Sequence, residues 1–76
     1  MKELIEFIVK ALVDDPSAIE VEKVESEKST TYKLRSAKSD IGKVIGKRGR
    51  TASAIRTIMT AVSARQGKKA VLEILE

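Results

Sequence analysis

Apolar residues near the N-terminus recur with a helical period. Between Met1 and about Val13 they fall at positions 1, 4, 5, 8, 9 and 12, the spacing that places side chains on one face of an amphipathic helix. Pro16 disfavours helical geometry in the residue before it and cannot continue a helix itself. The pattern therefore predicts a first helix that stops near Asp14.

Two residues make the apolar stripe of this helix wider than a small core requires. Phe7 and Val9 lie at its opposite edges. The simpler interpretation places both side chains at the edge of the core, because a core-facing stripe is itself broad. The alternative is that they contact a second protein chain, and the sequence leaves both interpretations open.

Alternation with a period of two follows this segment. Over residues 18–25 aliphatic side chains alternate with glutamates, and the phase slips at Lys23 and Val24, as at a bulge or a strand end. A polar turn follows at residues 26–29, and the alternation resumes over residues 30–35. The two runs predict an antiparallel hairpin.

The second half of the chain returns to helical spacing. Residues 41–45 predict a short helix with Ser39 or Asp40 as its N-cap, and Gly46 breaks it.

A longer helix is predicted from about Arg50 to the basic turn before Gly67, which occupies the position expected after a helix end. Residues 69–75 then predict a terminal strand. The resulting order is α-β-β-α-α-β, and we expect one α+β domain over residues 1–76, with a three-stranded sheet and the helices packed on one of its faces.

The composition excludes several classes of chemistry. The 76 residues include no Cys and no His, so the chain has no disulfide, no thiol nucleophile and no common transition-metal ligand. We interpret Glu20 and Glu22 as a solvated strand face rather than a metal or acid–base site. Asp40 is the only carboxylate close to the glycine-rich segment, and we interpret it as a helix cap. We therefore expect neither an enzyme nor a cofactor.

Charge is distributed unevenly along the chain. Residues 1–29 carry four lysines against eight acidic residues, a net charge of −4, whereas residues 30–76 carry eleven Lys or Arg against three acidic residues, a net charge of +8. A segregated basic region is the electrostatic footprint of a polyanion-binding surface, although small basic domains also carry such regions as solvated surface.

The N-terminal segment lacks the features of a targeting sequence. Acidic residues interrupt its apolar residues, no small-residue cleavage site follows, and no apolar run approaches the roughly 20 residues needed to span a bilayer. We expect a cytoplasmic protein without membrane association.

The glycine-rich segment carries the clearest functional signal. Gly46-Lys47-Arg48-Gly49 joins the two predicted helices. Such a junction leaves the amide N–H groups at the start of the following helix unpaired. Because each end of the junction is a glycine without a Cβ, a phosphodiester can approach these N–H groups. Lys47 and Arg48 add two cations at the tip, and two neighbours extend the same positive strip: Lys43 and Arg50.

Other interpretations of this segment carry less weight. One alternative is that the glycines serve only a tight corner between two helices, with the cations pointing into water. The surrounding helices and the basic context favour a phosphate site. A P-loop is excluded, because Gly42 to Lys47 is one residue short of that motif and Arg48 stands where a Ser or Thr should bind Mg²⁺.

The Ile45-Gly46-Lys47-Arg48-Gly49 core, the helix on each side and the order of elements resemble a type II KH domain. Over essentially its whole length, including the opening MKELIEFIVKALVDDP, the chain is similar to the small bacterial KH proteins of the KhpA family. One position departs from the wider KH pattern: Ala52 stands where a larger aliphatic residue commonly follows the second glycine. A smaller side chain there shrinks the base-facing wall of the groove.

The resemblance implies binding of about four nucleotides of single-stranded RNA, with single-stranded DNA as the alternative, in a groove beside a sheet edge. Gly46, Lys47, Arg48 and Gly49 would clamp the backbone. An apolar floor for the bases would come from Ile41, Val44 and Ile45, with Leu34 and Arg35 contributing from the neighbouring strand.

The chain has one Tyr and one Phe, so we do not expect base stacking to dominate the affinity. We expect weak, mostly electrostatic binding by one domain. We assume that one phosphate is neutralised by each of four cations, Lys43, Lys47, Arg48 and Arg50. The slope of log affinity against log salt concentration is then about −3, so that affinity falls about 50-fold between 50 and 200 mM salt. Pairing of two domains would supply avidity. Members of the family are associated with self-pairing and with a larger KhpB-type partner that contains a KH domain, in pathways that affect cell elongation and division.

Two functional hypotheses remain open at this point. The first is an RNA-binding protein that acts as an RNA chaperone or post-transcriptional regulator. The second is a protein-interaction or dimerisation subunit whose groove is vestigial. Reversing the charge of Lys47 and Arg48 distinguishes them, because the change abolishes the activity only in the first case.

Overall fold

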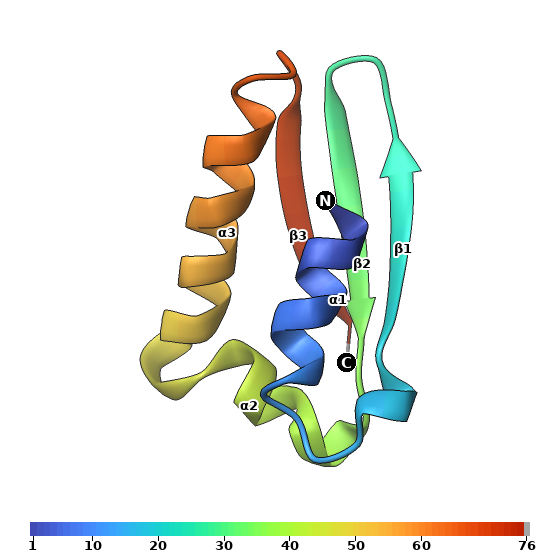
Figure 1. Cartoon of the computed structure of the whole chain (residues 1–76), viewed down its shortest axis with the longest axis vertical. Coiled ribbons are helices and arrows are strands. Elements are labelled where there is room, and N and C mark those ends of the chain that lie inside the picture. The colour runs from blue at the N-terminus through green and yellow to red at the C-terminus, as the bar shows by residue number, and fades with distance from the viewer. Residues whose placement is uncertain (76) are drawn as a thin grey trace.

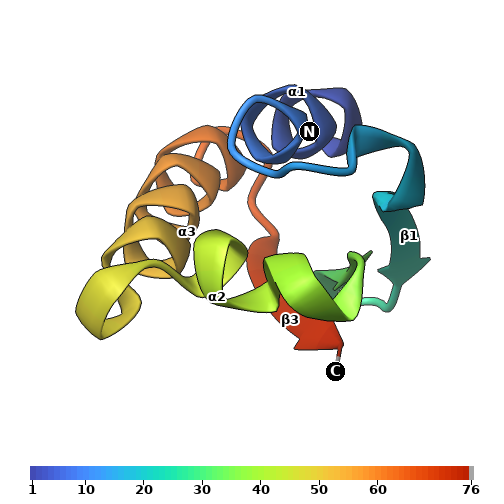
Figure 2. The same ribbon diagram turned by 90° about the horizontal axis from the view of Figure 1, so that it is seen from below.

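A mixed three-stranded sheet forms one layer of the molecule, and the helices form the other (Figures 1 and 2). The structure is a computed structural model and describes residues 1–75. The strands lie in the order β1 (Glu20–Glu25), β2 (Ser29–Arg35) and β3 (Lys69–Leu75). β1 and β2 form the expected antiparallel hairpin. β3 pairs in parallel with β2, since the intervening helices return the chain to the same end of the sheet.

The helices follow the order expected from the sequence, so the α-β-β-α-α-β prediction is confirmed. Their bounds are α1 (Lys2–Lys10), α2 (Ile41–Ile45) and α3 (Arg50–Ser63), with short 3₁₀ turns at η1 (Pro16–Ala18), η2 (Lys38–Asp40) and η3 (Lys47–Gly49). α1 and α3 lie on the same side of the sheet (Figure 2).

The core lies between these two layers. Because side chains alternate along a strand, Tyr32, Leu34 and Leu72 face the helices and are buried, whereas Glu20 and Glu22 lie exposed on the outer face. Their register partners on β2 are basic residues. From the helices, the buried residues are Ile5 and Val9 of α1, Val44 of α2, and Ala52, Ile55 and Met59 of α3.

The first helix is shorter than its apolar pattern predicts. It ends at Lys10, and the N–H of Leu12 bonds to the carbonyl of Val9 at 2.9 Å in a turn. The expectation that Phe7 and Val9 lie at opposite edges of one apolar stripe is also wrong. Val9 is fully buried in the core, and Phe7 is 76% exposed.

The first strand also differs from its prediction. It begins at Glu20 rather than near Ala18, because Pro16–Ala18 forms a 3₁₀ turn. The pairing with β2 continues without a bulge through Val24 to Glu25. The slip in the pattern arises because Val24 is an apolar residue on the exposed outer face.

None of the helices formed by residues 1–75 has the length and apolar character needed to cross a membrane.

Candidate nucleic-acid interface

The connection between α2 and α3 is built from unusual backbone conformations. Gly46 has φ/ψ of 80°/167° and Gly49 has 73°/13°. Between them Arg48 adopts a left-handed conformation with φ 58°, which costs a non-glycine residue about 1 kcal/mol. Three positive φ angles in four residues make a tight corner that places Lys47 and Arg48 at its exposed tip. We call residues 46–49 the glycine loop.

The two glycines of this loop serve different purposes. A Cβ at Gly46 would lie 2.2 Å from Oγ1 and 2.7 Å from the backbone nitrogen of Thr51, so the missing side chain lets the loop pack against the first turn of α3. A Cβ at Gly49 would meet no atom within 4 Å. The expectation that both glycines open the backbone to a ligand is therefore corrected: only Gly49 leaves open space.

The amides of the loop are also less available than expected. The N–H of Gly49 bonds to the carbonyl of Gly46 at 3.0 Å, and the N–H of Arg50 bonds to the carbonyl of Lys47. These amide groups are satisfied within the loop itself. The N–H groups of Gly49 and Arg50 are therefore not free for a ligand.

A groove of about 480 Å³ runs beside the loop. One wall comes from the end of α2 and the first turns of α3, and the other is the free edge of β3, the strand that lies at the border of the sheet. The lining is more apolar than polar, as in a site that holds flat rings. The residues that line it are Ile45, Gly49, Ala52, Arg56, Val71, Leu72, Glu73 and Ile74.

Arg56 is the cation within this groove. It lies one turn after Ala52 on α3, and its guanidinium donates to the carbonyl of Leu72 on β3 at 3.5 Å. The side chain thus bridges the two walls and leaves other N–H groups for a ligand. Sequence reasoning missed it, although its spacing of seven from Gly49 places it on the same face of α3.

Three cations in and directly after the loop have no acidic partner within the described residues. Lys47, Arg48 and Arg50 are exposed, and none forms an ion pair within 4.0 Å among residues 1–75. Unpaired cations keep their full charge for a phosphate. The expected positive strip is therefore present at these three positions.

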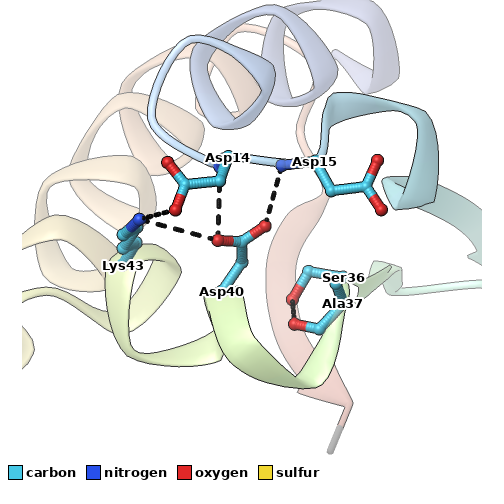
Figure 3. Close-up of polar contacts among 6 residues, drawn as sticks. All are labelled: Asp14, Asp15, Ser36, Ala37, Asp40 and Lys43. Carbon is cyan, nitrogen blue, oxygen red and sulfur yellow. Dashed lines mark hydrogen bonds and ion pairs between the residues drawn. The ribbon is translucent and has the colours of Figure 1, made fainter.

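Lys43 does not belong to this strip in the structure. Its ammonium donates to Oδ2 of Asp14 and lies 3.8 Å from Oδ1 of Asp40 (Figure 3). The hydrogen bond to Asp14 raises the pKa of Lys43 above its ordinary value, with desolvation acting against it. Because Lys43 and Ile45 are two positions apart on a helix, they point in nearly opposite directions. Lys43 thus faces the turn after α1 rather than the groove.

Asp40 holds this second cluster together. It is 1% exposed, and its carboxylate accepts hydrogen bonds from the N–H groups of Asp14 at 3.2 Å and Asp15 at 3.0 Å (Figure 3). It stands at the N-cap position of α2 but makes no capping bond to that helix. The expected cap is instead a tie between α2 and the turn after α1. We call the Asp14, Asp40 and Lys43 side chains the latch.

The remaining predicted site residues are dispersed. Ile45 lines the groove, and half-buried Ile41 lies one turn earlier on α2. Val44 and Leu34 are 0% and 1% exposed in the core, so neither side chain is available to a base. Arg35 points to the outer face of the central strand, opposite Glu20, and lines a separate hollow at the β1 side. The groove wall comes from β3 instead.

Acidic side chains are scarce along the lining of the groove. No group of three or more His, Cys, Asp or Glu that might hold a metal ion occurs in the part of the chain that the structure describes. Glu73 is the one carboxylate that lines the groove, and an acid–base pair needs a second titratable group nearby. Paired with exposed cations, an apolar groove is suited to hold bases on one side and phosphates on the other.

Comparison with known proteins agrees with this geometry. A family model of the KhpA/KhpB KH domain matches residues 2–74. No solved structure matches the chain significantly.

Curated relatives match over nearly their whole length, and they carry the name RNA-binding protein KhpA rather than that of an enzyme. The relative from Borreliella burgdorferi is 51% identical over 74 residues, 97% of this chain and 90% of its own. That from Listeria monocytogenes is 51% identical over 76 residues, all of both chains. That from Chlamydia trachomatis is 47% identical over 76 residues, 100% of this chain and 97% of its own. With the glycine loop between α2 and α3 and this full-length similarity, the chain belongs to the KhpA/KhpB KH-domain family.

Proposed function

We propose that the protein binds single-stranded RNA, with the phosphates at the glycine loop and the bases in the groove between α3 and β3. The observation that carries the proposal is the junction of the two: Gly49 belongs to the loop and also lines the groove. A strand held at the loop by its backbone therefore presents its bases to the apolar wall. The name of the relatives, RNA-binding protein KhpA, favours RNA over DNA.

The residues have separate roles in this proposal. Lys47, Arg48 and Arg50 neutralise phosphates, and open space beside Gly49 lets the backbone approach. Ile45 and Ala52, which line the groove, provide the apolar contact for bases, and half-buried Ile41 lies one turn before Ile45 on α2. Arg56 offers hydrogen-bond donors to base edges. Lys43 is left out of the contact set because it is bound in the latch.

The wider role rests on the family resemblance. It comprises action in the cytoplasm as an RNA chaperone or post-transcriptional regulator, and pairing with a second copy or with a KhpB-type partner in cell elongation and division. Pairing is supported by large apolar side chains that the helices leave exposed, namely Leu4 and Phe7 of α1, Leu12 beyond it and Ile58 of α3. Leu4 and Phe7 are three positions apart on α1 and are therefore neighbours on its surface. Large apolar residues exposed side by side indicate a contact surface.

Phe7 favours the second candidate function, a protein-interaction subunit. An aromatic side chain that is 76% exposed gains little from the fold of one chain. A protein contact on α1 is also compatible with RNA binding, because α1 does not contribute to the lining of the groove.

A charge-reversal experiment tests RNA binding. We would measure fluorescence anisotropy of a labelled single-stranded RNA pool with the wild type and with Lys47→Asp/Arg48→Asp. A matched control is Lys2→Asp/Lys10→Asp, which makes the same change in net charge on α1. Loss of binding in the loop variant alone supports the proposal. Equal binding by all three proteins contradicts it, and would direct attention to the exposed face of α1.

A further inference from the structure

A second group of unpaired cations lies at the end of the molecule opposite the glycine loop. The connection between α3 and β3 and the turn between β1 and β2 lie at that end (Figure 1), and the N–H of Lys69 donates to the carbonyl of Lys28 at 3.2 Å. This contact brings cations from both segments to one place. They are Lys28, Arg65, Lys68 and Lys69, which we call the distal cluster.

The charge of the distal cluster is largely uncompensated. Three of its members are exposed and Lys68 is half-buried. Within residues 1–75 none of the four forms an ion pair at 4.0 Å or less. Two glutamates lie near the turn of the neighbouring hairpin. Glu25 is bound by Lys23 at 2.9 Å, which lowers the pKa of its carboxyl, and the charge of Lys68 adds a smaller contribution. Glu27 is then the one carboxylate of this turn without an ion-pair partner in the described chain.

Helix electrostatics explain only part of this cluster. Cations near the C-terminus of a helix interact favourably with its dipole, which accounts for Arg65 just after α3. The same effect does not account for Lys28 and Lys69, which come from the hairpin and from β3. Cations that several elements bring to one surface are better explained by a shared anionic partner.

The charged side chains of α2, the glycine loop and α3 have one sign. Residues 41–72 contain eight Lys or Arg and no Asp or Glu. The groove beside α3 is lined by Arg56 from this segment and by Glu73 from β3. A polyanion that leaves the loop along α3 therefore meets Arg56 before it reaches Arg65, and passes one carboxylate at Glu73.

The distance between the two sites fits a short strand. α3 has 14 residues, which at about 1.5 Å per residue gives about 21 Å between its ends. A nucleic-acid strand advances at least about 3.4 Å per nucleotide when stacked, so about seven nucleotides are sufficient to cross it. This exceeds the roughly four nucleotides that a KH groove holds.

We propose that the distal cluster is a second phosphate-contact site for the same RNA strand that occupies the glycine loop and groove. The inference rests on the proposed function and extends it. The protein then binds a strand of about seven or more nucleotides at two points, and the cluster distinguishes long single strands from short ones.

The test compares salt dependence for two RNA lengths. We would measure anisotropy of a four-nucleotide and a ten-nucleotide single-stranded RNA at several salt concentrations. Each cation of the cluster that neutralises one phosphate steepens the log–log slope for the longer RNA by about 0.7. A longer strand also offers more registers to the loop, but registers change the affinity and leave the slope unaltered. The variants are Arg65→Gln/Lys68→Gln and, as control, Lys2→Gln/Lys10→Gln.

We expect the wild-type slope to be steeper for the longer RNA, and the cluster variant to remove about 1.4 of that difference without affecting the shorter RNA. The control should behave as the wild type. Equal slopes for both RNAs, with binding still abolished by Lys47→Asp/Arg48→Asp, would overturn the second site and leave the proposed function intact. Absence of binding to either RNA would overturn both.

Discussion

The backbone N–H of Asp15 donates a hydrogen bond to the carboxylate of Asp40 at 3.0 Å, across 25 positions of sequence. The same carboxylate accepts from the N–H of Asp14 and faces the ammonium of Lys43. Asp40 directly precedes α2, and the glycine loop directly follows that helix. The position of the loop thus depends on a buried side chain that does not line the groove.

Removal of the Asp40 carboxylate should destabilise the fold. Asp40→Ala leaves two backbone N–H groups without an acceptor and Lys43 with one fewer anion, a loss of about 3 kcal/mol in the free energy of unfolding. Asp40→Asn keeps one acceptor oxygen and should cost less. Urea denaturation measures both, with exposed Asp15→Asn as the control. A loss below about 0.5 kcal/mol in Asp40→Ala would show that the latch is dispensable.

The latch should also give the stability a dependence on alkaline pH. The hydrogen bond to Asp14 raises the pKa of Lys43 above its ordinary 10.5. A raised pKa in the folded state means that the contribution is fully present below 10.5 and is lost as pH rises through the folded value. The difference in Tm between wild type and Lys43→Met should therefore be constant near neutral pH and shrink above 10.5. A difference that stays constant to higher pH would contradict the ion pair.

The two glycines of the loop should respond differently to substitution. Gly46 occupies a backbone region that is essentially restricted to glycine, and any Cβ there clashes with Thr51. Gly46→Ala should cost at least about 3 kcal/mol, combining backbone strain and overpacking. Gly49 has left-handed angles that Asn tolerates, so Gly49→Asn should cost about 1 kcal/mol or less. Thermal or urea denaturation of both variants measures the free energy of unfolding that each one loses. Equal losses would contradict the different roles of the two glycines.

Substitution of Arg48 should change RNA binding while it leaves the stability of the fold nearly unchanged. Its left-handed conformation carries strain of about 1 kcal/mol that Arg48→Gly relieves, while the extra freedom of glycine in the unfolded chain offsets part of the gain. Stability should thus change by less than about 1 kcal/mol, whereas the salt slope of RNA binding should become shallower by about 0.7. An unchanged slope would remove Arg48 from the phosphate contacts.

The sequence alone predicted the elements because hydrophobic periodicity is a local property. The strand at Lys69–Leu75 and the start of α3 at Arg50 match the expectation. The early end of α1 was not predictable in this way, since residues 11–13 continue the helical pattern. The turn there is stabilised by Asp40, a residue distant in sequence.

The candidate site was predicted only where it is continuous in sequence. The glycine loop is four consecutive residues and could be found from spacing. The resemblance implies that Leu34 and Arg35 contribute from the strand beside the groove, but β2 is the central strand, with one of these side chains in the core and the other on the far face. The use of β3 as the wall of the groove and the ion pair of Lys43 with Asp14 both depend on tertiary contacts, which local sequence patterns do not reveal.

The most direct test of phosphate clamping by the glycine loop is the salt dependence of binding to a four-nucleotide RNA. With Lys47, Arg48 and Arg50 as the phosphate contacts, the log–log slope should be about −2, a loss of about 20-fold in affinity between 50 and 200 mM salt. This is shallower than the slope near −3 expected when Lys43 is counted. Arg50→Gln should reduce the slope by about 0.7 and Lys43→Gln should leave it unaltered. A wild-type slope near zero, or one that only Lys43→Gln reduces, would contradict the account.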